Sequence, residues 1–455
     1  MLGMFMFAAA VILLLVGFPV AFSFGGVAVL FTIFGSDFLP KTLGIDIFPW
    51  EPAFRAARLN IFPQRIFRIM SNYTLVAVPF FVFMGVMLEK SGLAEELLET
   101  MGILFGSMKG GLAIAVVAVG ALLAASTGVV GASVVTMGVL ALPVMLKYNY
   151  DKGLASGVVA ASGTLGQIIP PSIVLVILGD QIGVSVGDLF LGSFIPGFML
   201  ALMFMIWVAF ITNLKPEMGP PLPLEARSLR GFALAKKVIL NMLPPLTLIL
   251  MVLGTIFAGI ATPTEAGAMG AIGALGLAAI NKKLNLKNLM EAMDGTVKLT
   301  SMVFIILVGA TAFSMVFTAL HGDKVVQNFL LNLPGGKVGF IFFVMLVIFI
   351  LGFFIDFIEI TFIVVPLLVP IARQYFGLDM MVWFGVLIAM NLQASFLTPP
   401  FGFALFYLKG VAPPEIKTSD IYRGIIPFIT IQVLAVLLIA LFPSIVTWLP
   451  RMALK

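Results

Sequence analysis

The most constraining feature of this sequence is an uncharged run from Gly110 to Leu146. Its roughly 37 residues would form about 55 Å of helix, whereas the hydrocarbon core of a bilayer is about 30 Å thick. The run is therefore too long for one span and too short for two spans with a turn. Its middle, Ala125 to Ser133, is small and hydroxyl-bearing where lipid would favour Leu and Phe. We predict a re-entrant helical hairpin with ends at Lys109 and Lys147 and a polar tip near residues 126–128.

The next apolar stretch, Gly153 to Gly179, is predicted to be a broken helix. Its centre reads Ser-Gly-Thr-Leu-Gly-Gln-Ile-Ile-Pro-Pro-Ser, from Ser162 to Ser172. The two prolines remove amide donors, and the glycines give the backbone unusual freedom. Irregular backbone survives at membrane depth only where it lines a cavity or is buried in protein. A hairpin tip beside a broken helix is how secondary transporters build ion and substrate sites.

The composition predicts an all-α polytopic membrane protein. Hydrophobic residues make up 61% of the 455 residues and charged residues only 10%, far from the average of soluble proteins. There is no cysteine, and His321 is the only histidine, which argues against disulfides, thiolate chemistry, a His-based zinc site and a catalytic triad. The formal charge of +5 indicates membrane orientation rather than a nucleic-acid partner. Met1 to Phe34 is apolar without an early lysine, so we expect a retained span rather than a signal peptide.

A second long segment repeats the pattern of the first. Val338 to Ile371 has a polar centre from Gly352 to Thr361, and Met380 to Leu408 has a break from Asn391 to Pro400. Matching landmarks lie 225 to 229 residues apart: Gly111 and Gly336, Pro143 and Pro370, Asp151 and Asp379, Pro170 and Pro399. An offset that stays nearly constant over such a length indicates an internal structural repeat.

The charges of the loops predict that the two repeats are inverted. Two connections are basic and are expected in the cytoplasm. The first carries Lys215, Arg227, Arg230, Lys236 and Lys237, and the second carries Lys282, Lys283, Lys287 and Lys298. The turns at 180–188 and 262–265 have no Lys or Arg and are expected outside. The first hairpin then enters from the cytoplasm and the second from outside. The Arg-rich connection 37–70 falls outside, against the rule that basic loops lie in the cytoplasm. It is predicted to be an interfacial amphipathic helix, and a solvated loop is the alternative.

We expect about nine complete spans in addition to the two hairpins. Residues 89–180 and 321–412 are predicted to form the transport unit, each with an arm helix (Leu93–Met108 and Asp323–Leu333), a hairpin and a broken helix. Residues 1–88, 181–320 and 413–455 are predicted to form the scaffold. The predicted spans are Leu2–Phe34, interrupted at Gly17 and Pro19, and Ser71–Leu88, Leu189–Thr212, Val238–Pro263, Ala266–Ile280, Leu299–Leu320 and Ile425–Leu449.

Three motifs resemble the large membrane subunit of tripartite ATP-independent periplasmic (TRAP) transporters, and the resemblance covers essentially the whole chain. They are the turn Thr-Pro-Thr-Glu-Ala-Gly-Ala at 262–268, the break at 161–172 and the break Leu-Thr-Pro-Pro-Phe-Gly at 397–402. The family's first hairpin tip usually reads Ser-Gly-Ser-Ser, whereas this chain has Ser126-Thr127-Gly128, so substrate contacts are expected to differ.

The resemblance implies a sodium-driven elevator transporter for small organic acids in the bacterial inner membrane. It implies two protein partners, a small membrane subunit and a periplasmic substrate-binding protein, besides the surrounding membrane lipids. Because the chain begins directly at the first span, we expect the small subunit to be a separate chain.

The chemistry of the motifs supports at least two sodium sites. An unwound helix offers carbonyl oxygens without intrahelical partners, and Ser and Thr hydroxyls can supplement them. The candidate sodium ligands are Ser126, Gly128, Gly166, Ile169 and Pro170 in the first repeat, and Gly352, Asp356, Thr361, Ser395, Thr398 and Pro399 in the second. The candidate substrate residues are Ser126, Thr127, Ser162, Thr164 and Asn391. Close helix packing is the alternative explanation for one such cluster, but four clusters in repeat register favour binding sites.

Asp356 and Glu359 are ionisable groups expected at membrane depth, where a functional role is the default reading. A buried charge pair is the alternative, yet neither residue has a Lys or Arg near it in the sequence. Glu265 follows a turn and is expected in the N-cap region of a helix rather than as a ligand.

Other classes of function remain open from the sequence alone. A stand-alone sodium/dicarboxylate-type elevator symporter would act without a binding protein. An ion channel would also use re-entrant hairpins, but channel filters usually come from oligomeric rings. An intramembrane enzyme would need converging catalytic groups, for which Asp356 and Glu359 are the only candidates.

Overall fold

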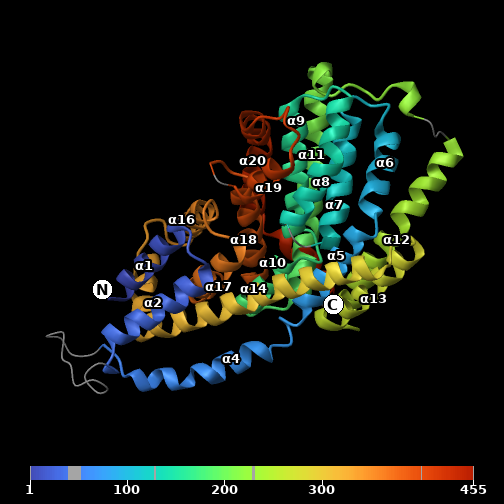
Figure 1. Ribbon diagram of the computed structural model, residues 1–455. Helices are drawn as coiled ribbons and strands as arrows, with labels where there is room; N and C mark the ends of the chain where they lie inside the picture. Colours follow the sequence, from blue (N-terminus) through green and yellow to red (C-terminus); the bar gives the residue numbers. More distant parts are fainter. Residues whose placement is uncertain (1, 39–52, 128–129, 228–230, 401, 454–455) are drawn as a thin grey trace.

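The computed structural model describes residues 2–38, 53–127, 130–227, 231–400 and 402–453, and these ranges are helical with no strand (Figure 1). Eight of the described helices are long and apolar enough to cross a membrane, or nine if the bent pair α5–α6 counts as one span. An all-α polytopic fold is confirmed.

The N-terminal helices break where proline and glycine predicted. Helices α1 (Leu2–Val16) and α2 (Val20–Gly35) are separated at Gly17, whose φ is +94°, and Pro19. After a short 3-10 turn, η1 (Ala56–Ile61), helix α4 (Phe62–Met70) packs along α14 and buries none of its residues. Figure 1 shows α4 along the lower edge of the molecule. The amphipathic helix is therefore confirmed for 62–70, while residues 39–52 of the connection lie outside the described residues.

The first repeat has the predicted order of elements. Helix α5 (Ala77–Lys90) bends by 60° into the arm helix α6 (Leu93–Phe105), because Gly92 adopts a left-handed φ of +76°. The hairpin follows as α7 (Gly111–Thr127) and α8 (Val130–Lys147). The broken helix consists of α9 (Lys152–Thr164), η2 (Leu165–Gln167) and α10 (Ile173–Ile182).

The second repeat follows the same order. Its arm is α15 (Gly322–Leu331), and its hairpin is α16 (Gly336–Leu351) with α17 (Phe357–Phe376). After η5 (Leu378–Met380), the broken helix is α18 (Met381–Phe396) and α19 (Phe403–Val411). The second arms, α8 with 18 residues and α17 with 20, reach the length of a span. Helix length alone therefore does not separate hairpin arms from spans.

The remaining helices depart from several of the predicted bounds, and α12, for example, covers Gly231–Phe257 instead of the predicted Val238–Pro263. These helices are α11 (Val186–Leu214), η3 (Pro216–Met218), η4 (Leu224–Ala226), α12 (Gly231–Phe257), α13 (Pro263–Ile280), α14 (Leu286–Ala319), α20 (Thr418–Leu441) and α21 (Ser444–Ala453). The span expected from Leu299 starts at Leu286, since its polar first turns are also helical and Lys298 pairs with Asp294 one turn away. The last predicted span is two helices, because α20 ends before Pro443, which cannot donate to a continuing helix.

The two repeats interlock. Each hairpin packs its first arm on the first half of its own broken helix, α7 on α9 and α16 on α18. Each packs its second arm on the second half of the other broken helix, α8 on α19 and α17 on α10. Each hairpin therefore packs on elements of both repeats.

The hairpins enter from opposite faces, as the inverted repeat requires. At the base of the first hairpin, the amides of Gly110 and Asp151 donate to the carbonyls of Gly219 and Met218, at 2.8 and 3.0 Å, beyond the C-terminal end of α11. At the base of the second, the Arg373 guanidinium donates to the Ile182 carbonyl at 2.6 Å, just before α11 begins. The two bases thus lie at opposite ends of α11, which confirms the inversion.

The Arg-rich connection lies on the face predicted for it. Asn72 donates from Nδ2 to Asp180 Oδ1 at 2.6 Å, and the Thr264 hydroxyl donates to the Tyr73 carbonyl at 2.7 Å. These contacts join the end of the connection to the 180–188 and 262–265 turns, which have no Lys or Arg. The connection therefore shares their face, which we call the outer face.

Packing separates two groups of helices. Helix α5 packs on α13 and α14, and α2 packs on α14, which together form the scaffold. The predicted boundaries left α11 and α20 to the scaffold, yet α20 packs chiefly on α9 and α18, and α11 packs on α7, α18, α20 and α21. Figure 1 shows α11 beside α7. By contact, α11, α20 and α21 lie with the hairpins and broken helices.

Candidate transport site

The two broken helices meet at a pair of equivalent residues. The Gln393 amide of α18 donates from Nε2 to Thr164 Oγ1 of α9 at 3.4 Å, and both residues are buried. They are 229 residues apart, the same offset that separates Pro170 from Pro399. A contact between equivalent positions lies on the axis that relates the repeats, so this pair marks the centre of the molecule.

The first break carries acceptors that have no donor. Ser162 and Thr164 are buried and donate to helix carbonyls, Ser162 to Val159 at 3.1 Å and Thr164 to Ala161 at 2.8 Å. Gly166, Ile169 and Pro170 are buried in the break. No donor within the described ranges reaches the carbonyl oxygens of Ile169 and Pro170. Because buried carbonyls normally have partners, these two oxygens suit a small cation.

The first hairpin lies against this break. A Cβ added to Gly120 of α7 would lie 2.5 Å from the Cβ of Ser162, so the two helices touch at that point. The tip itself is described only in part. Ser126 and Thr127 close α7, but their side chains lie outside the described part, and Gly128 lies outside it entirely. Their roles in binding stay predictions.

The second hairpin tip touches the second break. Gly352 ends α16, and a Cβ added there would lie 2.6 Å from the Cβ of Ser395 and overlap its hydroxyl. The rings of Phe357 and Phe396, which flank the tip and the break, lie 6.2 Å apart. The structure therefore brings Gly352 and Ser395 together, while their role in binding sodium stays a prediction.

The other candidate ligands of the second site have mixed surroundings. The Ser395 hydroxyl donates to the Leu392 carbonyl at 2.6 Å, and the Thr398 hydroxyl donates to the Ala394 carbonyl at 2.9 Å. Asp356 caps α17, accepting from the Phe357 amide at 2.7 Å. Pro399 is half-buried. Thr361 is fully buried, and its hydroxyl has no hydrogen-bond partner among the residues that the structure describes. Its oxygen is available to a ligand.

Two predicted residues lie away from these contacts. Asn391 donates from Nδ2 to the Met345 carbonyl at 2.8 Å and lines an apolar groove of about 540 Å³ between α16, α18 and α20. Glu359 is buried and lines a small cavity of about 20 Å³ with residues of α1 and α2. Asp356 thus caps α17, whereas Glu359, three residues later, faces the small cavity beside α1 and α2. Glu265 forms a capping box with Thr262, as its position predicted.

Comparison with known proteins decides the family. Residues 7–445 match the family described as the tripartite ATP-independent periplasmic transporter, DctM component. The chain belongs to this family. It is a transport permease and not an enzyme, so the intramembrane-enzyme alternative is excluded.

Characterised relatives align along the whole permease. The sialic acid TRAP transporter large permease SiaM of Vibrio cholerae is 30% identical, over 97% of each chain. The C4-dicarboxylate TRAP transporter large permease DctM of the same organism is 29% identical, over 98% of this chain and 97% of that one. The isethionate TRAP transporter permease DctMQ of Oleidesulfovibrio alaskensis is 28% identical, over 97% of this chain and 65% of the relative.

One solved structure shares the fold. The YdaH transporter of Alcanivorax borkumensis superposes with a TM-score of 0.60 at 12% identity, over 94% of this chain and 99% of that one. At this identity the similarity concerns the arrangement of helices alone.

Sequence reasoning missed three buried glutamines of the permease. Gln167, Gln393 and Gln432 are fully buried on η2, α18 and α20. In the described ranges, both amide atoms of Gln167 and Gln432 and the Oε1 atom of Gln393 have no hydrogen-bond partner. An unsatisfied buried amide costs free energy, so these amides on η2, α18 and α20 are available to water or to a polar ligand. The available signal was an amide within an otherwise apolar helix.

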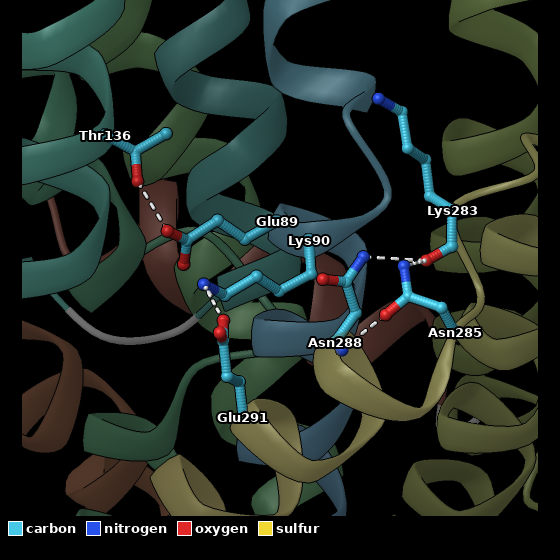
Figure 2. Close-up of polar contacts among 7 residues, drawn as sticks. All are labelled: Glu89, Lys90, Thr136, Lys283, Asn285, Asn288 and Glu291. Carbon is cyan, nitrogen blue, oxygen red and sulfur yellow. Dashed lines mark hydrogen bonds and ion pairs between the residues drawn. The ribbon is translucent and has the colours of Figure 1, made fainter.

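The end of α5 links the permease's scaffold to its first hairpin. Figure 2 shows Glu89 accepting from the Thr136 hydroxyl of α8 at 2.7 Å, while Lys90 pairs with Glu291 of α14 at 2.6 Å. The start of α14 is fixed by Asn285, whose Oδ1 accepts from the Asn288 amide at 2.8 Å. Glu89 thus contacts the first hairpin, while the next residue, Lys90, contacts the scaffold helix α14.

Proposed function

We propose that this permease takes up a small organic acid across the bacterial inner membrane, coupled to sodium, by an elevator motion. The observation that carries the proposal is the contact of a re-entrant tip with a broken helix, Gly352 against Ser395, within an inverted repeat. Broken helices at a repeat interface form the ion and substrate sites of secondary transporters. Sialic acid, C4-dicarboxylates and isethionate, named for the relatives, are all organic acids, which supports an acid as substrate.

Sodium binding is supported by the oxygen atoms available at the breaks. In the first repeat these are the Ile169 and Pro170 carbonyls, with Ser126, Gly128 and Gly166 as further candidates. In the second they include the Thr361 hydroxyl, with Asp356 near the tip. Neutral carbonyls and hydroxyls with at most one carboxylate suit a monovalent hard cation. At least two sodium ions, one for each repeat, follow from the symmetry.

The elevator motion is supported by the two groups of helices. The transport unit consists of the hairpins, the broken helices, the arms and, by their contacts, α11, α20 and α21. Glycines with left-handed φ stand at the arms, Gly92 at +76° and Gly335 and Gly336 at +88° and +56°. Such positions can change angle at little cost. Movement of the unit requires the Glu89–Thr136 hydrogen bond to break.

Two protein partners complete the proposal, a small membrane subunit on the scaffold and a periplasmic substrate-binding protein on the outer face. The stand-alone symporter is the alternative. Uptake by the permease with its small subunit, but without the binding protein, would favour that alternative.

The test is uptake by proteoliposomes that contain the permease and its small subunit, with the loaded binding protein outside. We expect accumulation of labelled acid only when a sodium gradient is directed inward, and none when potassium replaces sodium. Accumulation that is equal in sodium and potassium would contradict sodium coupling.

Engineered disulfides test the motion, since the chain has no native cysteine. The Glu89→Cys/Thr136→Cys pair joins scaffold to hairpin and should abolish uptake until it is reduced. The matched Gly192→Cys/Val446→Cys pair joins α11 to α21, where a Cβ on Gly192 would lie 3.2 Å from a Val446 methyl carbon, and should be tolerated. Equal inhibition by both pairs would indicate a local gate instead of an elevator.

A further inference from the structure

A cavity of about 430 Å³ opens at the outer face, between scaffold and transport unit. Its scaffold walls come from α4, α14 and the segment before α5, and its other walls from α10 and α17. This outer cavity contains none of the predicted sodium or substrate residues. Its volume lies within the range of about 300–1,000 Å³ typical of small-molecule sites.

Two arginines give the outer cavity its charge. Arg65 and Arg68 lie one turn apart on α4, so both line the same space. Within the described ranges, neither guanidinium has a hydrogen-bond or ion-pair partner. A guanidinium matches a carboxylate with two parallel hydrogen bonds, so this pair is suited to an organic anion.

The one carboxylate of the outer cavity does not neutralise the arginines. Asp180 accepts from Asn72 Nδ2 on one oxygen at 2.6 Å and from Gln181 Nε2 on the other at 2.8 Å. Both oxygens are thus engaged by neutral amides, and the lining keeps an excess of positive charge. Thr311 and Ser314 of α14 add hydroxyls that have no hydrogen-bond partner in the described part of the chain.

We propose that the outer cavity is a second binding site, which holds the carboxylate of the organic acid on Arg65 and Arg68 before the acid reaches the central site. The inference rests on the proposed function. Because the walls belong to both groups of helices, the site exists in only one position of the transport unit. The Asn72–Asp180 hydrogen bond joins the two walls and must break when the unit moves.

The test uses the full chain with cysteine-free small subunit in proteoliposomes, and a reporter cysteine, Thr311→Cys, in the cavity wall. Ile260→Cys is the matched control, since Ile260 is exposed beside the 262–265 turn of the same face. Alkylation rates are measured with an anionic and a cationic methanethiosulfonate. We expect the anionic reagent to be favoured at Thr311→Cys over the control by on the order of fivefold, the effect of a nearby unit charge.

Occupancy is measured by protection of the same cysteine. Succinate, isethionate and N-acetylneuraminate are the anionic probes, and neutral succinamide is the control. We expect at least one acid to slow alkylation while succinamide does not. Both the charge preference and the protection should disappear in Arg65→Gln/Arg68→Gln and persist in Arg55→Gln/Arg58→Gln, whose arginines belong to the same connection but do not line the cavity.

Three results would overturn the inference. Equal charge preference at Thr311→Cys and Ile260→Cys would mean that the cavity does not attract anions. Slow alkylation of Thr311→Cys in phosphatidylglycerol vesicles, with no organic acid added, would mean that the arginines bind lipid phosphates. A raised half-saturating concentration of binding protein in Arg65→Gln/Arg68→Gln, with unchanged alkylation, would assign them to docking of that protein. Failure of sodium-coupled uptake would leave all these labelling results unaffected, so the two proposals fail separately.

Discussion

Replacing Gly352 by Ala tests the packing of the second hairpin tip against its break. Gly352 has an ordinary helical φ of −67°, so the backbone accepts a side chain there. The added Cβ would lie 2.6 Å from the Cβ of Ser395, whereas carbon atoms normally approach to about 3.5–4.0 Å. The tip must then retreat by about 1 Å. Overpacking of this kind costs about 1–3 kcal/mol of folding free energy.

The assay combines thermal unfolding in detergent with the sodium dependence of uptake. We expect Gly352→Ala to lower the unfolding temperature and to raise the half-saturating sodium concentration several-fold. The matched control is Gly254→Ala in α12, where an added Cβ meets nothing within 4 Å. That variant should be unchanged or more stable by up to about 1 kcal/mol, because Ala favours helix over Gly.

A second substitution separates packing from ligand chemistry. Gly352→Ala/Ser395→Gly removes the obstructing side chain and should restore the unfolding temperature. If the Ser395 hydroxyl binds sodium, sodium activation stays impaired in this double variant and in Ser395→Ala. The reasoning is refuted if Gly352→Ala unfolds and responds to sodium as the parent does, since the tip would then not be packed on the break.

Three further variants probe other parts of the molecule. A side chain in Gly424→Ala would overlap the backbone of α9, so this variant should lose about 1–3 kcal/mol of folding free energy in thermal unfolding. Gly276→Ala is the control, because its added Cβ lies in open space. Equal stabilities of the two variants would contradict the contact of α9 with α20. Asp356→Ala should raise the sodium requirement of uptake more than it reduces co-purification with the small subunit, and an unchanged requirement would remove Asp356 from the site. The Tyr150 hydroxyl accepts from the Leu112 amide at 3.1 Å, and burial raises the pKa of Tyr150 to about 12. Since this pKa exceeds the ordinary value near 10, the stability that the neutral Tyr150 side chain contributes is complete below pH 10 and is lost as the pH rises through 12. In pH-dependent unfolding, Tyr150→Phe should abolish that loss.

Local sequence determined the elements of this protein. The length of the apolar run at 110–146 and the small residues in its middle specified a hairpin. The prolines and glycines at 162–172 and 391–402 specified the breaks, because they remove amide donors and free the backbone. The constant offset of these landmarks specified the repeat. Each of these signals depends on chain length and residue type alone, so no knowledge of neighbours was needed.

Only the tertiary structure decided which side chains share a site. Ser162 and Asn391 are equivalent in the two repeats and each contacts the first arm of its own hairpin, yet only Asn391 also lines an apolar groove. Thr164 meets Gln393, and Arg65 shares a cavity with α10 and α17. Lipid is as apolar as a protein interior, so hydrophobicity alone does not separate the buried face of a membrane helix from its lipid face. Which faces meet is set by the interlocking of the two repeats, and that depends on contacts between residues far apart in the sequence, such as Arg373 with Ile182 at 191 positions and Gln393 with Thr164 at 229.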